Sequence, residues 1–222
     1  MSKDCALHGQ GAAAAYDALV AGADREPVPT KSGGHQPLTG EDIREATQDY
    51  LILTLHWPEL AQAIVKAQAG DATDFIHDPD DTLDPVQVQV PACLDDARPV
   101  RALSQLTSLQ AELTRISPHL GGAVRSYKAM AGCLGWPVPA EPVTSEPSVH
   151  GAPPALVLQS THQALAPFEA GAAMAAQLPG GVVPAHEGDD YSMFLSSWRV
   201  RDATNRYLTT RALPAAGTVC TD

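Results

Sequence analysis

The sequence is poor in positive charge, in aromatic residues and in long apolar runs. Lysine and arginine number 14 against 26 aspartates and glutamates, which gives the 222-residue chain a formal net charge of −12. This balance argues against a nucleic-acid-binding face, which needs a basic patch, and against docking on anionic membranes. No apolar run approaches the ~20 residues of a transmembrane helix, and the N-terminus shows no apolar signal-peptide core. We therefore expect no nucleic-acid partner, no membrane partner and a cytoplasmic location for the chain as written; the parent protein could be exported if the chain is a fragment.

Cysteine is also scarce, and its spacing excludes the common zinc motifs. The four cysteines lie far apart and match no pattern of the C-x₂-C type. A cytosolic location favours thiols, whereas an exported protein could carry two disulfides. We expect no metal and no cofactor. The residues concerned are Cys5, Cys93, Cys133 and Cys220.

Apolar residues recur at helical spacing through most of the first 136 residues. Thr39-Gly-Glu-Asp42 resembles a capping box and predicts the start of a helix whose apolar stripe includes Ile43. Val86-Gln-Val-Gln-Val90 alternates apolar and polar residues, so we expect a short half-buried strand there. The pattern predicts further helices over residues 10–23, 57–70, 103–116 and 123–133.

Six prolines fall between residues 137 and 154, a density that excludes both helix and central strand. We therefore place a linker at 137–154, between a helical region at 1–136 and a C-terminal segment at 155–222. In that segment strand and helix alternate, which implies a right-handed parallel crossover. The predicted elements are a strand at 155–159, a helix at 167–177, a strand at 182–183 and a helix at 198–208.

Two parallel strands make a poor sheet by themselves. Parallel sheets are normally covered on both faces, and small isolated sheets are marginally stable. No segment before residue 86 has the pattern of a strand. Either the missing strands come from another polypeptide, or helices from 1–136 mask the edge of the sheet. We expect a partner that pairs with this edge, or self-association through it.

Several stretches of the chain follow the order of a known family. Leu156–Glu169 resembles the segment that carries the catalytic acid in tripeptidyl-aminopeptidase-like α/β-hydrolases, and Glu187–Ser192 resembles their catalytic-histidine loop. The family's next helix and turn, its closing segment and its helical lid also have similar stretches here, so the resemblance covers nearly the whole chain. These further stretches are Ala175–Gly180, Tyr207–Cys220, Cys5–Gly9, Thr39–Asp42 and Cys133–Pro137.

The resemblance implies an α/β, helix-rich chain with a partial α/β-hydrolase fold. It would lack the N-terminal strands and combine a helical lid at 1–136 with the last two parallel strands. A disulfide between Cys93 and Cys133 could brace the lid against the core; the alternative is two buried thiols. Trp136, which could otherwise be a packing residue, is a candidate to line a cleft between lid and core, together with His162 and Phe168.

At two positions of the family's catalytic triad, this chain has residues with different side-chain chemistry. Members place aspartate where this chain has Gln163 and histidine where it has Tyr191. Glutamine carries no charge to stabilise an imidazolium, and a phenol is a poor general base at neutral pH. The sequence also lacks a G-x-S-x-G turn for the nucleophile and an HGGG-type oxyanion loop.

These departures predict a truncated member of the tripeptidyl-aminopeptidase-like serine hydrolase family that is catalytically incompetent alone. The family's activity is the hydrolysis of peptide, amide or ester bonds. The alternative is a non-catalytic binding module for a small apolar ligand or for a partner hydrolase half, which would supply the N-terminal strands.

Two clusters of titratable residues leave alternatives open. His162 or His186 could act as a relocated base with Asp189 or Asp190 as its partner, or they could be loop histidines at the surface. The run from 186 to 190 could bind a metal or form a solvated acidic loop. A calcium loop is rejected for the earlier acidic cluster, because it lacks the glycine and the terminal glutamate of an EF-hand. That cluster consists of Asp78, Asp80, Asp81 and Asp84.

Overall fold

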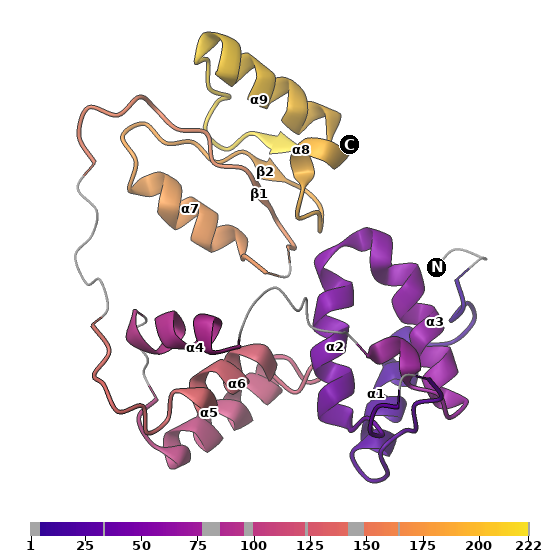
Figure 1. Ribbon diagram of the computed structural model, residues 1–222. Helices are drawn as coiled ribbons and strands as arrows, with labels where there is room; N and C mark the ends of the chain where they lie inside the picture. Colours follow the sequence, from indigo (N-terminus) through magenta and orange to yellow (C-terminus); the bar gives the residue numbers. More distant parts are fainter. Residues whose placement is uncertain are drawn as a thin grey trace. The chain divides into compact units, whose positions relative to one another are not determined.

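The computed structural model describes residues 5–32, 34–76, 85–95, 100–122, 124–141, 149–163 and 165–221. Contacts within the chain define two compact units (Figure 1). Unit 1 comprises Met1–Tyr50 and Trp57–Thr144, and unit 2 comprises Leu51–His56 and Ser145–Asp222. Unit 1 is helical in its described part, whereas unit 2 contains a small parallel sheet. None of the helices in these ranges is long and apolar enough to cross a membrane.

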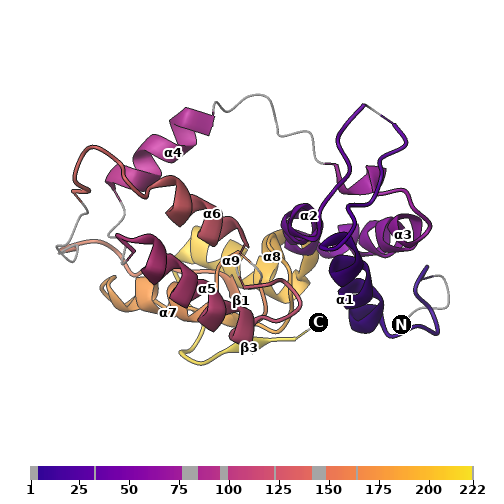
Figure 2. The same ribbon diagram turned by 90° about the horizontal axis from the view of Figure 1, so that it is seen from below.

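The first three α-helices build the main apolar core of unit 1. Helices α1, α2 and α3 lie side by side in both views (Figures 1 and 2), and each turns an apolar stripe inward. Leu19, Ile43, Ile64 and Phe75 are all at most 6 % exposed, and Ile43 is fully buried. The bounds are Ala12–Ala23 for α1, Gly40–Ile52 for α2 and Trp57–Gln68 for α3, with short 3-10 helices at Thr54–His56 and Thr73–Phe75.

The start of α2 confirms the predicted capping box. The backbone N–H of Thr39 donates to Oδ2 of Asp42 over 2.8 Å, and the N–H of Asp42 lies 3.3 Å from Oγ1 of Thr39. Two backbone donors that the helix itself cannot satisfy are thereby paired. Gly40 then allows close approach to α1, because a Cβ there would lie 2.6 Å from the carbonyl oxygen of Val20.

Three further helices complete the described part of unit 1. Helix α6 packs against both α4 and α5. The predicted helices at 103–116 and 123–133 are confirmed, as are those at 10–23 and 57–70, with ends shifted by a few residues. The bounds are Pro85–Leu94 for α4, Leu103–Ile116 for α5 and Val124–Gly132 for α6.

The strand predicted at Val86–Val90 is wrong, because these residues belong to helix α4. An alternating run forms a strand only when a neighbouring strand accepts its backbone hydrogen bonds. No strand of the described residues pairs with this run, whereas a helix satisfies its own backbone. Helical spacing also places Gln89 and Cys93 on one face, one turn apart, where both meet α6.

Unit 2 is organised around three short parallel strands in the order β1-β2-β3. Gln159 pairs with Ala185, and Ala185 pairs in turn with Val219. A bridge between Leu156 and Val182 continues the β1–β2 register toward the N-terminal end. The strands are Gln159–Ser160 for β1, Ala185–His186 for β2 and Val219–Cys220 for β3.

The observed sheet corrects the predicted pair of strands. Val182, the start of the predicted strand at 182–183, forms only a bridge, and the regular strand begins three residues later. Pro184 lies between them and has no N–H to donate, so one rung of the ladder to β1 is missing. The third strand was not predicted, because two residues next to a glycine turn at Gly217 carry no periodic signal.

Helices cover both faces of this sheet. Successive side chains of a strand point to opposite faces, so the side chains of Gln159 and Ser160 lie on opposite faces of the sheet. Gln159 packs against Gly171 of α7, whereas Ser160 contacts Met193 of α8. Helix α9 joins α8 on that second face through Val200 (Figure 1). The helices are α7 at Phe168–Ala176, α8 at Met193–Ser196 and α9 at Trp198–Thr210, which confirms the helices predicted at 167–177 and 198–208.

Candidate functional site

The carboxyl ends of β1 and β2 lie next to each other, and the loops that follow them form the candidate site. In open α/β sheets, ligands bind at this edge, outside the carboxyl ends of the strands. Backbone bonds join the two loops beyond the strands: Thr161 N–H donates to the carbonyl of His186 over 2.9 Å, and His162 N–H donates to Gly188 over 3.0 Å. The N–H of Gly188 donates in return to the Thr161 hydroxyl over 3.3 Å.

Gln163, predicted at the position of the acid, shapes the loop after β1. Its side chain is 7 % exposed, and Oε1 accepts backbone N–H bonds from Leu165 and Ala166, both over 2.6 Å. A carboxylate could accept the same two bonds and carry a charge in addition. The Nε2 of Gln163 is buried without a hydrogen-bond partner among the described residues. Gln163 therefore stabilises the loop through its carbonyl and leaves one buried donor without a partner among the described residues.

Tyr191, predicted at the position of the histidine, follows the loop after β2. It is 55 % exposed and is followed by Ser192, the residue that caps the short helix α8. A half-exposed phenol can donate or accept a hydrogen bond, but it supplies no imidazole. The chemistry of a serine-hydrolase base is therefore absent from this position.

Asp190 joins three segments of unit 2. Its Oδ2 lies 3.4 Å from Nε2 of His186, and its Oδ1 lies 3.5 Å from the hydroxyl of Thr54. The backbone carbonyl of Asp190 accepts a 2.6 Å hydrogen bond from Ser160. Thr54 comes from the Leu51–His56 segment, far away in sequence. Sequence reasoning missed both Ser160 and Thr54; neither carries a local signal, since each acts through a distant partner.

His186 lies beside Asp190, the partner expected of a relocated base, and that alternative stays a prediction. It is 4 % exposed, and its Nδ1 has no hydrogen-bond partner among the described residues. Ser160 pairs with His186 in the sheet and is itself fully buried. Its hydroxyl donates a hydrogen bond to the carbonyl of Asp190. A nucleophile needs a hydrogen bond to its base and access to the substrate. Ser160 has neither in this arrangement.

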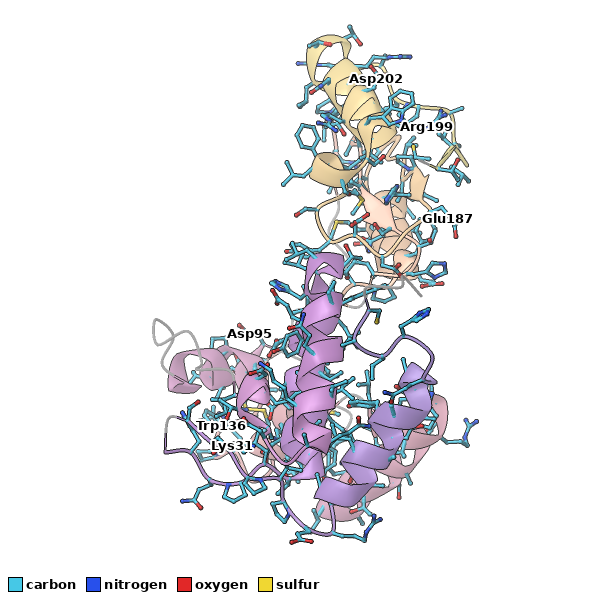
Figure 3. The ribbon with its side chains drawn as sticks, turned by 90° about the vertical axis from the view of Figure 1, so that its right-hand side faces the viewer. Lys31, Asp95, Trp136, Glu187, Arg199 and Asp202 are labelled. Atoms are coloured by element: carbon cyan, nitrogen blue, oxygen red, sulfur yellow. A yellow bond between two sulfur atoms is a disulfide. The ribbon has the colours of Figure 1, made fainter. Side chains whose placement is uncertain are left out.

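His162 forms a surface pair with Glu187. Nε2 of the histidine lies 3.3 Å from Oε1 of the glutamate, and both side chains are more than half exposed. Figure 3 shows Glu187 at the loop after β2. Exposed pairs of this kind contribute little to stability. The alternative of a relocated base at His162 stays a prediction.

The remaining predicted residues are distributed over both units. Trp136 belongs to unit 1, whereas His162 and Phe168 belong to unit 2, and the cleft they were expected to share stays a prediction. Cys93 and Cys133 form a disulfide, and Cys220 is a buried thiol. The acidic cluster from 78 to 84 lies outside the described residues.

The described part of the chain contains no group of three or more histidine, cysteine, aspartate or glutamate side chains that could hold a metal ion. The metal alternative for residues 186–190 therefore has no support from the geometry. What the loops can do is position hydrogen-bonding groups at the carboxyl edge of a parallel sheet. They present no charged acid at 163 and no imidazole at 191.

A small parallel sheet covered by helices on both faces, with polar loops at its carboxyl edge, is compatible with part of an α/β-hydrolase fold. Comparison with known families identifies the segment more closely: residues 118–220 match the family described as TAP-like protein. This match supports the predicted resemblance to TAP-like α/β-hydrolases over that segment. The match includes α6, all three strands, Gln163 and Tyr191. No curated protein matches the chain in sequence.

Proposed function

We propose that the chain is a truncated TAP-like serine hydrolase that does not hydrolyse its substrate by itself. The family match supports membership among hydrolases, whose activity here would be on peptide, amide or ester bonds. The observation that carries the proposal is the state of Gln163. It is buried in the loop after β1, and its side-chain carbonyl accepts hydrogen bonds from two backbone N–H groups.

The chemistry of acyl transfer explains why this arrangement is incompetent. The acid of a triad holds the imidazole and stabilises the imidazolium that forms during attack. Gln163 offers no negative charge, and Tyr191 offers no imidazole to be held. The sequence contains no G-x-S-x-G turn, so this chain provides no serine on a nucleophile elbow.

The test is hydrolysis of tripeptidyl and aminoacyl chromogenic amides, together with labelling by a fluorophosphonate serine probe. We expect neither turnover nor a covalent adduct. The double variant Gln163→Asp, Tyr191→His restores the family's residue types and should also remain inactive, because it still lacks a nucleophile. Turnover that persists through purification, with a serine adduct located by mass spectrometry, would contradict the proposal.

The outer edge of β1 favours a second candidate, a binding module for a partner hydrolase half. Odd-numbered residues of this strand bond to β2: Val157 N–H, for example, donates to Val182 over 2.9 Å. The even-numbered residues turn their backbone groups to the other side. The backbone groups of Leu156, Leu158 and Ser160 are therefore expected to face away from β2, along the outer edge. Such an edge pairs readily with another strand.

Co-expression with the N-terminal half of a TAP-like hydrolase tests this candidate. We expect the two chains to co-purify when the edge is intact. Leu156→Pro removes one outward N–H and should weaken the complex, whereas Leu156→Ala shortens the side chain but keeps the N–H and should not. Co-purification that is equal for both variants, or absent for the unmodified chain, would contradict pairing through this edge.

A further inference from the structure

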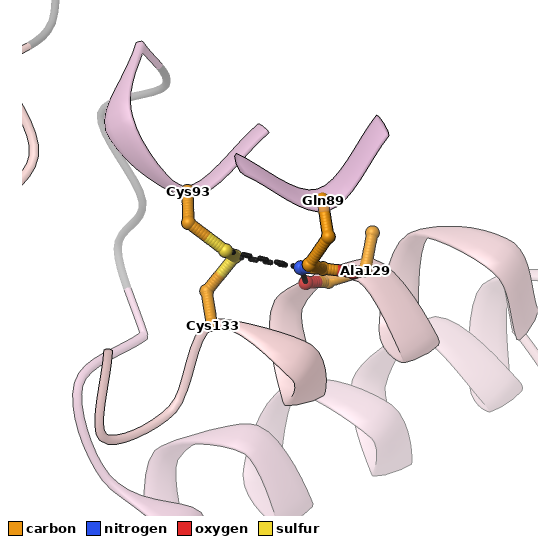
Figure 4. Close-up of a disulfide and its surroundings, with 4 residues drawn as sticks. All are labelled: Gln89, Cys93, Ala129 and Cys133. Carbon is orange, nitrogen blue, oxygen red and sulfur yellow. Dashed lines mark hydrogen bonds between the residues drawn. A yellow bond between two sulfur atoms is a disulfide. The ribbon is translucent and has the colours of Figure 1, made fainter. Parts of the chain in front are cut away.

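The two cysteines of the Cys93–Cys133 disulfide differ in their exposure to solvent. The bond joins the last turn of α4 to the residue that follows α6, within unit 1 (Figure 4). Cys93 is 4 % exposed, whereas Cys133 is partly exposed. Thiol–disulfide exchange requires a thiolate to reach one of the two sulfurs directly. We therefore expect a small thiol to reach the more exposed Cys133 more readily than Cys93.

The carboxamide of Gln89 lies against both sulfurs. Its Nε2 is 3.0 Å from Sγ of Cys93 and 3.2 Å from Sγ of Cys133, and it also contacts the carbonyl oxygen of Ala129 at 3.4 Å (Figure 4). Gln89 precedes Cys93 by one helical turn, which brings the two side chains to one face of α4. The amide nitrogen is therefore within hydrogen-bond distance of the Cys93 sulfur, the one that would leave if Cys133 were attacked.

Gly132, the last residue of α6, makes room for this amide. A Cβ at position 132 would lie 2.9 Å from both Nε2 and Oε1 of Gln89. Since Cβ atoms do not approach other heavy atoms so closely, any larger residue at 132 would displace the carboxamide. Both helices therefore determine where the donor lies: α4 carries it, and α6 leaves space for it.

We propose that Cys133 is a site of reversible thiol–disulfide exchange with low-molecular-weight thiols, and that Gln89 promotes the exchange by hydrogen bonding to the departing Cys93 sulfur. A disulfide sulfur is a weak acceptor, so the amide gains little from it in the oxidised form. A thiolate is a charged acceptor and forms a stronger bond with the same N–H. Gln89 therefore favours the state in which Cys93 has left.

The exchange proceeds in two balanced steps. The thiolate of the small molecule attacks Sγ of Cys133 and forms a mixed disulfide; the Cys93–Cys133 bond breaks, and its electron pair goes to Sγ of Cys93. A second small thiolate attacks the small molecule's sulfur in that mixed disulfide. This step forms the oxidised small-molecule disulfide and releases Cys133 as a thiolate. The protein disulfide is reduced by two electrons, and the two small thiols are oxidised.

Exchange should loosen α4 from α6. The disulfide attaches the last turn of α4, and Pro91 within the same helix removes one backbone donor from its interior. A helix with a missing hydrogen bond depends more on its tertiary contacts. We therefore expect amide protons of α4 to exchange faster with solvent once the bond is broken.

The first test maps the mixed disulfide. The oxidised full chain is incubated with reduced glutathione, quenched with iodoacetamide and analysed by peptide mass spectrometry. We expect the glutathione adduct on Cys133, with Cys93 carrying the alkyl group. An adduct found mainly on Cys93, or equally on both residues, would overturn the proposal.

The second test measures the rate of reduction by glutathione in three variants. Gln89→Met keeps the shape of the side chain but removes the donor, and should slow reduction by about fivefold. Gly132→Ala leaves Gln89 in the sequence but displaces its amide, and should slow reduction in the same direction. Gln68→Met is the matched control, because Gln68 also donates through Nε2 to a backbone carbonyl, that of Ala15, and is far from the disulfide in sequence.

The reduction rates of these variants show whether the Gln89 amide promotes the exchange. Slower reduction of Gln89→Met and Gly132→Ala, with Gln68→Met unchanged, supports the role of the amide. Unchanged or faster reduction of Gln89→Met contradicts it, as does an equal slowing by the control. Far-UV circular dichroism of the oxidised variants, compared with the unmodified chain, identifies any variant whose rate reflects unfolding. If either Gln89→Met or Gly132→Ala is unfolded, the rate of the other one decides the test.

Discussion

The two units bury different kinds of side chains. In unit 1 a continuous cluster of aliphatic and aromatic residues from α1, α2, α3 and the following 3-10 helix forms the core. The buried apolar cluster of unit 2 is much smaller and consists of Met193, Val200 and Cys220, with Leu158 packed against it. Polar residues show the reverse distribution: of the six buried ones in the described part of the chain, all except Thr47 belong to unit 2. Those five are Gln159, Ser160, Gln163, His186 and Ser197.

This difference separates a packing module from a segment that carries a site. Apolar burial stabilises a fold without regard to direction, whereas a buried polar group stabilises it only when its hydrogen bonds are made. In unit 2 most of these bonds are made, but the Gln163 amide nitrogen and one ring nitrogen of His186 have no partner among the described residues. Unit 2 thus keeps a polar interior at the edge where α/β sheets bind ligands.

The largest expected effect concerns the apolar core of unit 1. Ile43 is fully buried in α2, so Ile43→Ala removes packed methyl groups and leaves a cavity. We expect the free energy of unfolding to fall by about 3 kcal/mol, measured by urea denaturation. A loss below about 1 kcal/mol would mean that this core collapses around the gap, and that the packing of unit 1 is looser than the structure shows.

The next effect concerns the contact between α1 and α2. A Cβ at Gly40 would lie 2.2 Å from Oδ1 of Asp24 and 2.6 Å from the backbone carbonyl oxygen of Val20. Gly40→Ala should therefore destabilise the chain by about 2 kcal/mol, because the backbone of α1 must shift. Gly22→Ala is the matched control: nothing lies within 4 Å of a Cβ there, and alanine favours the helix. Equal thermal shifts in the two variants would contradict the close approach.

In unit 2 a hydrogen bond takes the place of apolar packing. Ser160→Ala removes the 2.6 Å bond to the carbonyl of Asp190 and leaves that carbonyl without its donor. We expect a loss of about 1.5 kcal/mol, together with faster amide hydrogen exchange in the loop that precedes α8. A variant as stable as the original, with unchanged exchange in this loop, would show that the polar interior contributes nothing to holding the loop.

The same contrast explains which parts of the structure the sequence could predict. Helices of unit 1 were predictable because their apolar spacing and the Thr39–Asp42 capping box are local signals, and the structure confirms both. The assignment of Gln163 and Tyr191 to triad positions rests on the family resemblance alone and stays a prediction. The strand at Val86–Val90 was wrong because an alternating pattern does not show whether a pairing strand exists.

Contacts between distant segments were beyond sequence reasoning. Thr54 reaches Asp190 across 136 residues, and the strand Val219–Cys220 is defined by its pairing with Ala185 and His186. The amide of Gln89 is brought to two sulfurs that are 40 residues apart in the chain. In each case the physical cause is a tertiary partner, which a local pattern of residue types does not encode.

A smaller effect is expected in unit 1 at high pH. Burial is the main cause that raises the pKa of Tyr16 in unit 1 above the ordinary value of 10.0. A group whose pKa is raised on folding stabilises the fold below the unfolded pKa, and this stability is lost as pH rises from that value through the folded pKa. The melting temperature should therefore fall above pH 10, and it should fall less in the variant Tyr16→Phe, which has no phenol to ionise. An identical decline in the variant would contradict a buried phenol.

The smallest effect is expected where a charge pair is exposed. Glu187→Gln removes the charge opposite His162, and both side chains are more than half exposed to solvent. We expect the free energy of unfolding to change by less than about 0.5 kcal/mol, because water already screens this pair. Asp190→Asn in the same loop is the comparison: it weakens contacts to the buried His186 and to Thr54, and should lower stability more. If the two variants lost equal stability, the distinction between a buried polar interior and a solvated loop surface in unit 2 would fail.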